Sequence, residues 1–181
     1  NLLELLIIRV PEGDLTPILF DQNEGDRLFV RPKMVGTYLL PKLDADLTLI
    51  LASTGTGVAP HMTMLEACVD TCRQVVMMEC VRYSDELAYA EQIRKFQQTH
   101  PNLVYISLVT REGGTKRYIQ DYFRDGILEE EHGVTIAPEM THVFACGNPD
   151  MIGIPKEDRK TGAVSYETPG GLVEILTTRY G

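Results

Sequence analysis

The sequence predicts an α/β protein in which a doubly wound parallel sheet of about five strands follows a short antiparallel segment. Two observations predict this fold class. From residue 46 onward, apolar runs of strand length alternate with stretches of helical periodicity, which is typical of a parallel sheet covered by helices on both faces. Residues 1–43 lack this alternation and contain closely spaced turn signals. We therefore expect two domains, 1–43 and 44–181.

Each expected strand of the sheet is a nearly continuous apolar run, as a strand buried on both faces requires. The expected strands span 47–53, 74–81, 103–109 and 141–146, and the expected helices span 60–72, 85–98, 117–125, 149–153 and 170–180. Gly126 is expected to end the third of these helices, because glycine tolerates the conformation that follows a helix C-terminus. Residues 155–169 are polar and predict a loop.

The N-terminal segment predicts two or three strands, among them 5–10 and 27–31, and a short helix at 15–20 that contains Pro17. So few strands cannot close a barrel, and they leave unpaired edges. This segment is therefore expected to be part of a larger β domain.

Composition narrows the function. The chain has 181 residues, 44% of them hydrophobic, and a formal net charge of −9. Nucleic-acid binding requires a basic face and binding to anionic membranes requires basic segments, so neither partner is expected. The sequence contains neither a signal peptide nor a run long enough to span a membrane. Its four cysteines lack the spacing of a zinc site and predict reduced thiols, so we expect a cytoplasmic protein.

The segment Leu51–Pro60 is the clearest functional signal. A buried strand ends here in a turn with Gly55 and Gly57, and Pro60 lies in the first turn of the next helix, where its missing N–H has no cost. Free backbone N–H groups and the helix dipole at such a turn attract anions. A second glycine segment, beginning at Cys146, ends a later strand in the same way. These features predict a dinucleotide at the carboxyl edge of the sheet.

Basic residues gather at the same edge. Arg82 follows the second strand, and Arg111 and Arg117 follow the third. Guanidinium groups bind phosphate through paired hydrogen bonds, whereas an NAD site more often has an acidic residue after its second strand. NADP is therefore the preferred cofactor over NAD. The alternative is that these basic residues bind no phosphate and form a solvated basic rim. Cys146 ends a strand beside flexible residues and is expected to contact a planar ring, although the sequence places no histidine to activate it.

Several segments, in this order along the chain, resemble bacterial-type ferredoxin–NADP reductases. They are Pro11–Pro17 with Glu24–Asp26, Ser53–Pro60, Val81–Arg82 with Glu86–Tyr89, Thr110–Glu112, Arg117 and Ala145–Met151. The N-terminal segment resembles the second half of that family's antiparallel flavin-binding β-barrel. The resemblance implies a parallel NADP-binding sheet preceded by part of this barrel.

The resemblance also implies roles for individual residues. Leu15 and Thr16 would meet the FAD pyrophosphate, and Thr54 and Thr56, with Gly55 and Gly57, would lie between flavin and nicotinamide. Arg82, Thr110, Arg111 and Arg117 would hold the 2′-phosphate end of NADP, and Gly147, Asn148, Asp150 and Met151 would line the rest of that cofactor. Cys146 would lie beside the nicotinamide and, with Thr54, would be catalytic.

The implied activity is hydride transfer between NADPH and FAD, followed by one-electron exchange with ferredoxin or flavodoxin. The family's flavin-gripping Arg-x-Tyr-Ser segment and its closing aromatic strand are absent from the sequence, so we expect a reductase truncated at both ends. Two alternatives stay open. One is a non-catalytic NADP-binding module, and the other is an NADH-dependent reductase component of an oxygenase system.

Overall fold

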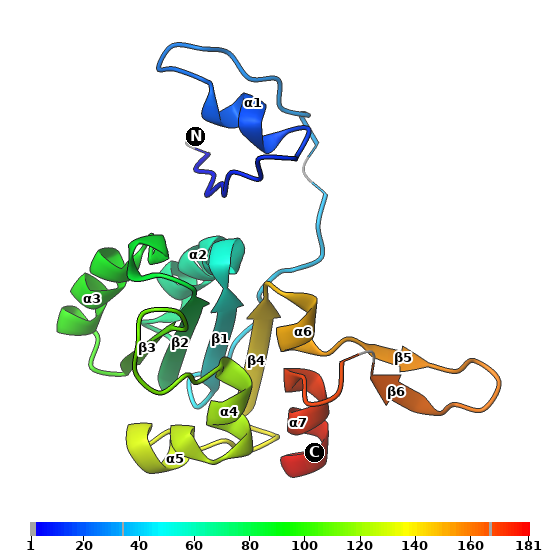
Figure 1. The fold of residues 1–181 in the computed structure, drawn as a ribbon. Helices are drawn as coiled ribbons and strands as arrows, with labels where there is room; N and C mark the ends of the chain where they lie inside the picture. The colour runs from blue at the N-terminus through cyan, green and yellow to red at the C-terminus, as the bar shows by residue number, and fades with distance from the viewer. Residues whose placement is uncertain (1–2, 34, 167) are drawn as a thin grey trace. The chain divides into compact units, whose positions relative to one another are not determined.

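The structure is a computed structural model that describes residues 3–33, 35–166 and 168–181. The chain divides into two compact units, Asn1–Lys42 and Leu43–Gly181 (Figure 1). In the described ranges, no helix has both the length and the apolar character needed to cross a membrane.

The described residues of the first unit form one helix, α1 (Thr16–Phe20). Its start is tied to the preceding turn, because the Thr16 hydroxyl accepts the backbone N–H of Val10 at 2.9 Å. The strands expected at 5–10 and 27–31 were wrong, since the described residues there form no strand. The physical reason is that strands are stable only when neighbours satisfy their backbone groups. Apolar side chains of this unit are exposed, including Leu15 at 62% and Phe29 at 93%.

The second unit is built on a four-stranded sheet in the order β3-β2-β1-β4. Its strands are β1 (Thr48–Thr54), β2 (Gln74–Val81), β3 (Leu103–Val109) and β4 (Thr141–Cys146). All three pairings are parallel. The predicted parallel sheet is confirmed, with four strands in place of about five. Parallel pairing also brings the four carboxyl ends to one edge, as the sequence predicted.

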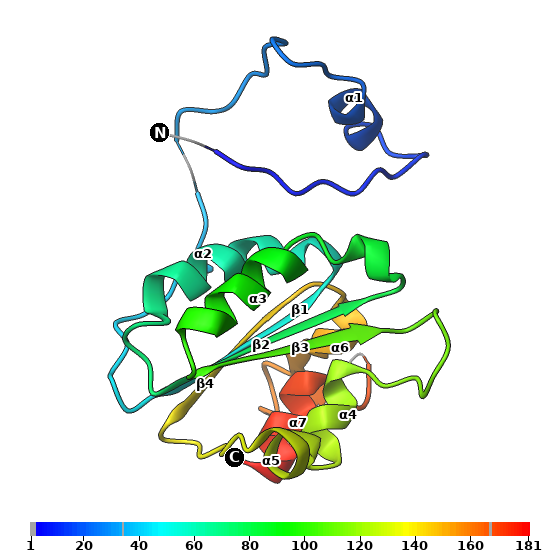
Figure 2. The ribbon, with the colours of Figure 1, turned by 90° about the vertical axis from the view of Figure 1, so that its left-hand side faces the viewer.

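Helices cover both faces of this sheet (Figure 2). On one face lie α2 (Val58–Cys68) and α3 (Ala90–Thr99), and on the other lie α4 (Ile119–Arg124), α5 (Ile127–His132) and α7 (Leu172–Arg179). The doubly wound arrangement is therefore confirmed. The central strand β1 explains why the layers hold together, because Leu49, Ile50, Leu51 and Ala52 are all fully buried and successive side chains point to opposite faces.

Element boundaries differ from the predictions in instructive places. The expected helix 85–98 is interrupted: a short 3-10 turn, η2 (Ser84–Glu86), precedes α3. Helix α5 was not predicted, and Gly126 ends one helix and begins the next with a φ of 75°. The expected helix 60–72 begins two residues earlier and ends at Cys68. In each case the missed feature is one or two turns long, which is too short for apolar periodicity to define.

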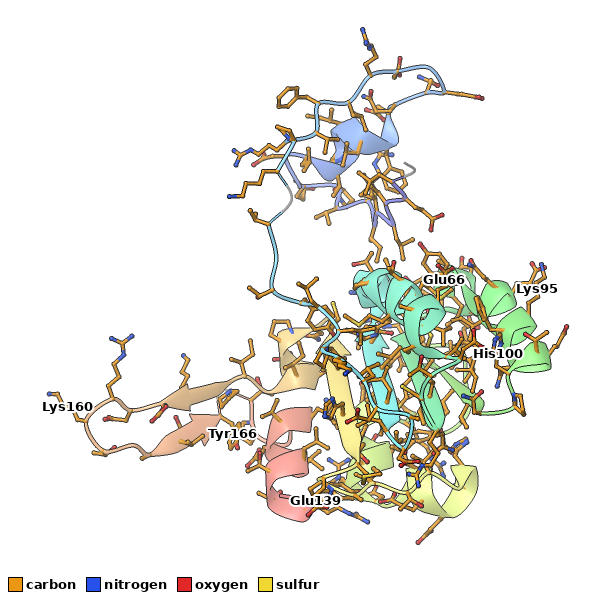
Figure 3. All side chains as sticks on the ribbon, turned by 180° about the vertical axis from the view of Figure 1, so that it is seen from behind. Glu66, Lys95, His100, Glu139, Lys160 and Tyr166 are labelled. Carbon is orange, nitrogen blue, oxygen red and sulfur yellow. The ribbon has the colours of Figure 1, made fainter. Side chains whose placement is uncertain are left out.

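The expectation of a loop at 155–169 was wrong for part of this segment. It contains an antiparallel hairpin formed by β5 (Pro155–Glu157) and β6 (Val164–Tyr166). The hairpin projects from the sheet and its helices, with Lys160 near its tip and Tyr166 toward its base (Figure 3). Its strands are short and mostly exposed, so no alternation of apolar and polar residues signals them. At its base, Gly153 and Gly171 approach so closely that a Cβ on Gly171 would lie 2.3 Å from the Gly153 Cα.

One carboxyl group lies buried in the sheet. Glu79 of β2 is 0% exposed, and its Oε2 accepts the Tyr105 hydroxyl of β3 at 2.7 Å. Burial raises the pKa of Glu79 above its ordinary value, while the Tyr105 hydrogen bond opposes this shift. The folded chain therefore retains a proton that the unfolded chain releases above about pH 4.5.

This linkage predicts a pH-dependent stability. Wild type is expected to lose unfolding free energy relative to Glu79→Gln as pH rises from 4.5 through the folded pKa of Glu79. The loss is at most about 1.4 kcal/mol per pH unit, because one proton is involved. Urea unfolding between pH 5 and 8 measures it, with Glu139→Gln at an exposed glutamate as the control. Parallel stability curves for wild type and Glu79→Gln would contradict the prediction.

Candidate nucleotide-binding site

The two glycine segments meet at the carboxyl edge, where the chain order of the sheet reverses. From β1 the chain adds β2 and β3 on one side, and it then returns to add β4 on the other. The ends of β1 and β4 are adjacent, with Ser53 paired in register with Cys146. Open parallel sheets bind ligands at such a reversal, because the loops there diverge and leave a crevice.

Close packing of these segments explains both of their key glycines. A Cβ on Gly57, in the turn η1 (Gly55–Gly57), would lie 2.1 Å from the Cys146 carbonyl oxygen. Gly147 has a φ of 142°, and a Cβ there would lie 2.0 Å from the Thr54 Oγ1. Both positions therefore require glycine. The sequence indicated that these glycines form turns and leave backbone N–H groups free for an anion. The structure shows that they also allow the two loops to pack in contact.

A hydrogen bond closes the same junction. The Thr54 Oγ1 accepts the backbone N–H of Asn148 at 2.7 Å, linking residues 94 positions apart. Asn148 in turn begins α6 (Pro149–Ile152), where its side chain accepts the backbone N–H of Asp150 at 3.0 Å. The Asp150 Oδ1 accepts the Thr168 hydroxyl at 3.0 Å. Thr54, Gly147, Asn148 and Asp150 thus lie together at this junction.

Met151 lies elsewhere. Its side chain is 4% exposed and belongs to the hydrophobic core shared by the sheet and helices α4, α5 and α7. Met151 anchors α6 to this core, so it supports the loop between β4 and α6.

The loops after β2 and β3 are joined by backbone hydrogen bonds that continue the sheet past its strands. The Thr110 N–H donates to the Val81 carbonyl at 3.0 Å, and the Arg111 N–H donates to the Arg82 carbonyl at 2.9 Å. The Thr110 hydroxyl also donates to Val81, at 3.1 Å. Arg82 and Arg111 are thereby held side by side on adjacent strand ends, and both are exposed.

Arg117 differs from the other two arginines because it already has a counter-ion. Its Nη1 lies 3.2 Å from the Oε1 of Glu131 on α5, and this carboxylate raises the pKa of the guanidinium. A phosphate bound by Arg117 must therefore compete with Glu131. The sequence did not reveal this pair, because no local pattern links a loop residue to a helix 14 positions away.

Two further carboxylates at this edge were missed. The Glu86 Oε2 accepts the backbone N–H groups of Arg82 at 2.8 Å and Tyr83 at 3.2 Å. The Glu112 Oε1 accepts the backbone N–H of Ser84 at 2.8 Å. Glu86 is recognisable from its closeness to the turn, but Glu112 reaches across from the next strand.

Comparison with known proteins adds to this geometry. Residues 51–157 match the family described as the oxidoreductase NAD-binding domain. This range contains the glycine turn after β1, the loops that carry the three arginines, and the junction between the ends of β1 and β4. The chain belongs to this family.

Several proteins that are similar in sequence to this chain are reductases. The chain is 35% identical over 162 residues to a ferredoxin–NADP reductase of Pseudomonas aeruginosa, covering 83% of this chain and 63% of the relative. It is 28% identical over 156 residues to the flavodoxin/ferredoxin–NADP reductase of Escherichia coli, with the same two coverages. The chain thus spans just over three fifths of the length of these curated relatives.

A solved structure shares the fold. The ferredoxin NADP+ reductase of Neisseria gonorrhoeae, described with bound FAD and NADP, matches with a TM-score of 0.67 at 20% identity. The match covers 79% of this chain and 60% of that one.

Burial shifts the pKa of two titratable side chains near the carboxyl edge of the sheet. Burial raises the pKa of the Cys146 thiol above its ordinary value, which disfavours the thiolate form that a nucleophile needs. His61, on α2, is fully buried, and burial lowers its pKa to about 4.

The two residues expected at the FAD pyrophosphate lie in the first unit. Leu15 precedes α1 and is 62% exposed. The Thr16 hydroxyl is engaged with the backbone of Val10, so it stabilises the turn before the helix.

Proposed function

We propose that this chain forms the NADP-binding domain, and part of the flavin-binding domain, of a flavin-dependent reductase. Such an enzyme passes electrons between NADPH and a one-electron carrier, ferredoxin or flavodoxin. The observation that carries the proposal is the placement on one carboxyl edge of Arg82 and Arg111, after β2 and β3, and of the Thr54–Asn148 junction, at the reversal of strand order. The reductases named among its relatives support the same conclusion.

The residues present fit NADP. Arg82, Arg111 and Arg117 supply cationic forks for the 2′-phosphate, and Thr110 fixes the loop that carries Arg111. At the other end of the edge, Thr54, Thr56, Gly55 and Gly57 would support the nicotinamide, with Gly147, Asn148 and Asp150 opposite. Cys146 would present a neutral thiol to the ring, where it contributes packing and position.

The first unit fits part of a flavin-binding domain. Its exposed apolar side chains, such as Phe29 and Val35, are those a larger β domain would cover, and this favours the reductase over a stand-alone NADP module. Leu15 and Thr16 are the residues assigned to the FAD pyrophosphate. FAD, when bound, accepts hydride and releases electrons singly, and the protein's part is to orient the two rings.

The free cysteines support our assignment of the compartment. Cys68, Cys72, Cys80 and Cys146 are free thiols, and the first three are buried. Disulfide-free cysteines support a reducing compartment, so we assign the protein to the cytoplasm.

The proposal is tested on the purified chain by titration with NADP+ and NAD+ in a calorimeter, together with its absorption spectrum. We expect NADP+ to bind at least about tenfold more tightly, as one phosphate–arginine interaction provides. A flavin spectrum with NADPH-driven reduction of a one-electron acceptor supports the reductase, whereas colourless protein that binds NADP+ supports the module. Tighter binding of NAD+ would favour the NADH-dependent alternative.

A further inference from the structure

Three consecutive backbone N–H groups at the end of β2 donate to carboxylates. Glu86 accepts two of them, from Arg82 and Tyr83, and Glu112 accepts the third, from Ser84. Glu86 lies within the same turn. Glu112 comes from the loop after β3, 28 positions away, so it connects two loops that carry different arginines.

The hydrogen bond of Glu112 extends a series of hydrogen bonds between the loops after β2 and β3. The Thr110 and Arg111 N–H groups donate to the Val81 and Arg82 carbonyls at 3.0 and 2.9 Å, and the next residue, Glu112, reaches Ser84 through its side chain at 2.8 Å. Arg111 therefore lies between two anchored residues, and Arg82 is itself anchored, through its N–H to Glu86 and through its carbonyl to Arg111. Fixing both backbones lowers the entropy that the arginines lose when they close on one phosphate.

We propose that Glu112 is a positioning residue for the 2′-phosphate subsite, holding the Arg82 and Arg111 loops at the separation that a single phosphate requires. This inference rests on the proposed function, because it assigns a role within the proposed NADP site. Glu112 acts through its hydrogen bond to Ser84, and it does not touch the nucleotide.

A carboxylate at this position has a second conceivable effect, which is opposite in sign. Acidic residues after the second strand accept ribose hydroxyls in NAD sites, and a negative charge there would repel a 2′-phosphate. Glu112 is exposed, so water and salt weaken its repulsion, and its Oε1 is engaged by Ser84. Positioning is therefore the effect that we expect to dominate.

Glutamine and alanine variants separate the two effects. Glu112→Gln keeps an oxygen that accepts the Ser84 N–H and removes the charge, whereas Glu112→Ala removes both. Calorimetry on the full chain would compare 2′,5′-ADP with 5′-AMP, which lacks the 2′-phosphate. Glu139→Ala is the control for net charge, because Glu139 is exposed and lies at the opposite end of the sheet (Figure 3).

We expect Glu112→Ala to weaken 2′,5′-ADP binding about tenfold, the equivalent of one charge-assisted hydrogen bond. Glu112→Gln should stay within about twofold of wild type, since a neutral acceptor retains the contact. Binding of 5′-AMP and the circular dichroism spectrum should be unchanged in both variants.

Other results would overturn the inference. Tighter 2′,5′-ADP binding in both variants would show that charge repulsion dominates. Equal weakening in both variants, unchanged affinity in Glu112→Ala, or a parallel loss of 5′-AMP binding would each remove the positioning role. A wild-type chain that binds 5′-AMP but gains nothing from the 2′-phosphate would instead overturn the proposed NADP function.

Discussion

Replacement of Arg111 by alanine is expected to weaken NADPH binding about 10- to 150-fold and to leave NADH binding nearly unchanged. A hydrogen bond between charged partners contributes about 1.5–3 kcal/mol, and each 1.4 kcal/mol is a factor of ten. Within the part of the chain that the structure describes, Arg111 forms no ion pair. Its guanidinium is therefore available without displacing a carboxylate.

The measurement is the ratio of NADPH to NADH affinity, by titration of wild type and variants. Arg117→Ala should have a smaller effect, because Arg117 must first release Glu131. Lys95→Ala is the control, since Lys95 is exposed on α3 and pairs with Glu91 at 2.8 Å. An unchanged ratio in Arg111→Ala would show that this loop does not hold the 2′-phosphate.

Gly147→Ala should cost about 3–5 kcal/mol of unfolding free energy and should also abolish nucleotide binding. Its φ of 142° is strained for an alanine, and the added Cβ would collide with the Thr54 Oγ1 at 2.0 Å and with the Thr54 backbone at 2.8 Å. Relief of the collision requires the β4 loop to move away from β1, which breaks the hydrogen bond between Thr54 and Asn148.

Gly162→Ala is a matched control for backbone strain. Gly162 has a φ of 69°, but nothing lies within 4 Å of the position that an added Cβ would take, so it should lose only about 1–2 kcal/mol. Urea unfolding of both variants, with NADP+ titration, compares strain alone with strain plus collision. Equal losses would mean that the contact between the two loops contributes nothing.

The sheet was largely predictable from the sequence, and the first unit was not. Runs such as 75–78 are apolar throughout and the strands that contain them lie between helical stretches, so strand and helix periodicities identify them locally. The segments 5–10 and 27–31 have strand-like composition too, but a strand also needs a neighbour. The hairpin of β5 and β6 shows the reverse case, in which pairing occurs without an apolar pattern.

The candidate site, too, was only partly predictable from the sequence. Arg82, Arg111 and Arg117 were found from their positions after strands, because parallel order brings all strand ends to one edge. Their counter-ions and supports were not found: Glu131 and Glu112 act across 14 and 28 positions. Such contacts depend on where two loops lie in space, and sequence spacing carries no record of that.

By itself, the sequence determined the order of the four sheet strands and of the longer helices between them, and the glycine turn at 54–57, because periodicity and turn chemistry are local properties. Only the tertiary structure decided why Gly57 and Gly147 must be glycines. Each lies against the backbone of the other's loop, and the sheet order that places β4 beside β1 creates that contact. Close packing between distant segments is a property of the assembled sheet, so it appears only once the chain has folded.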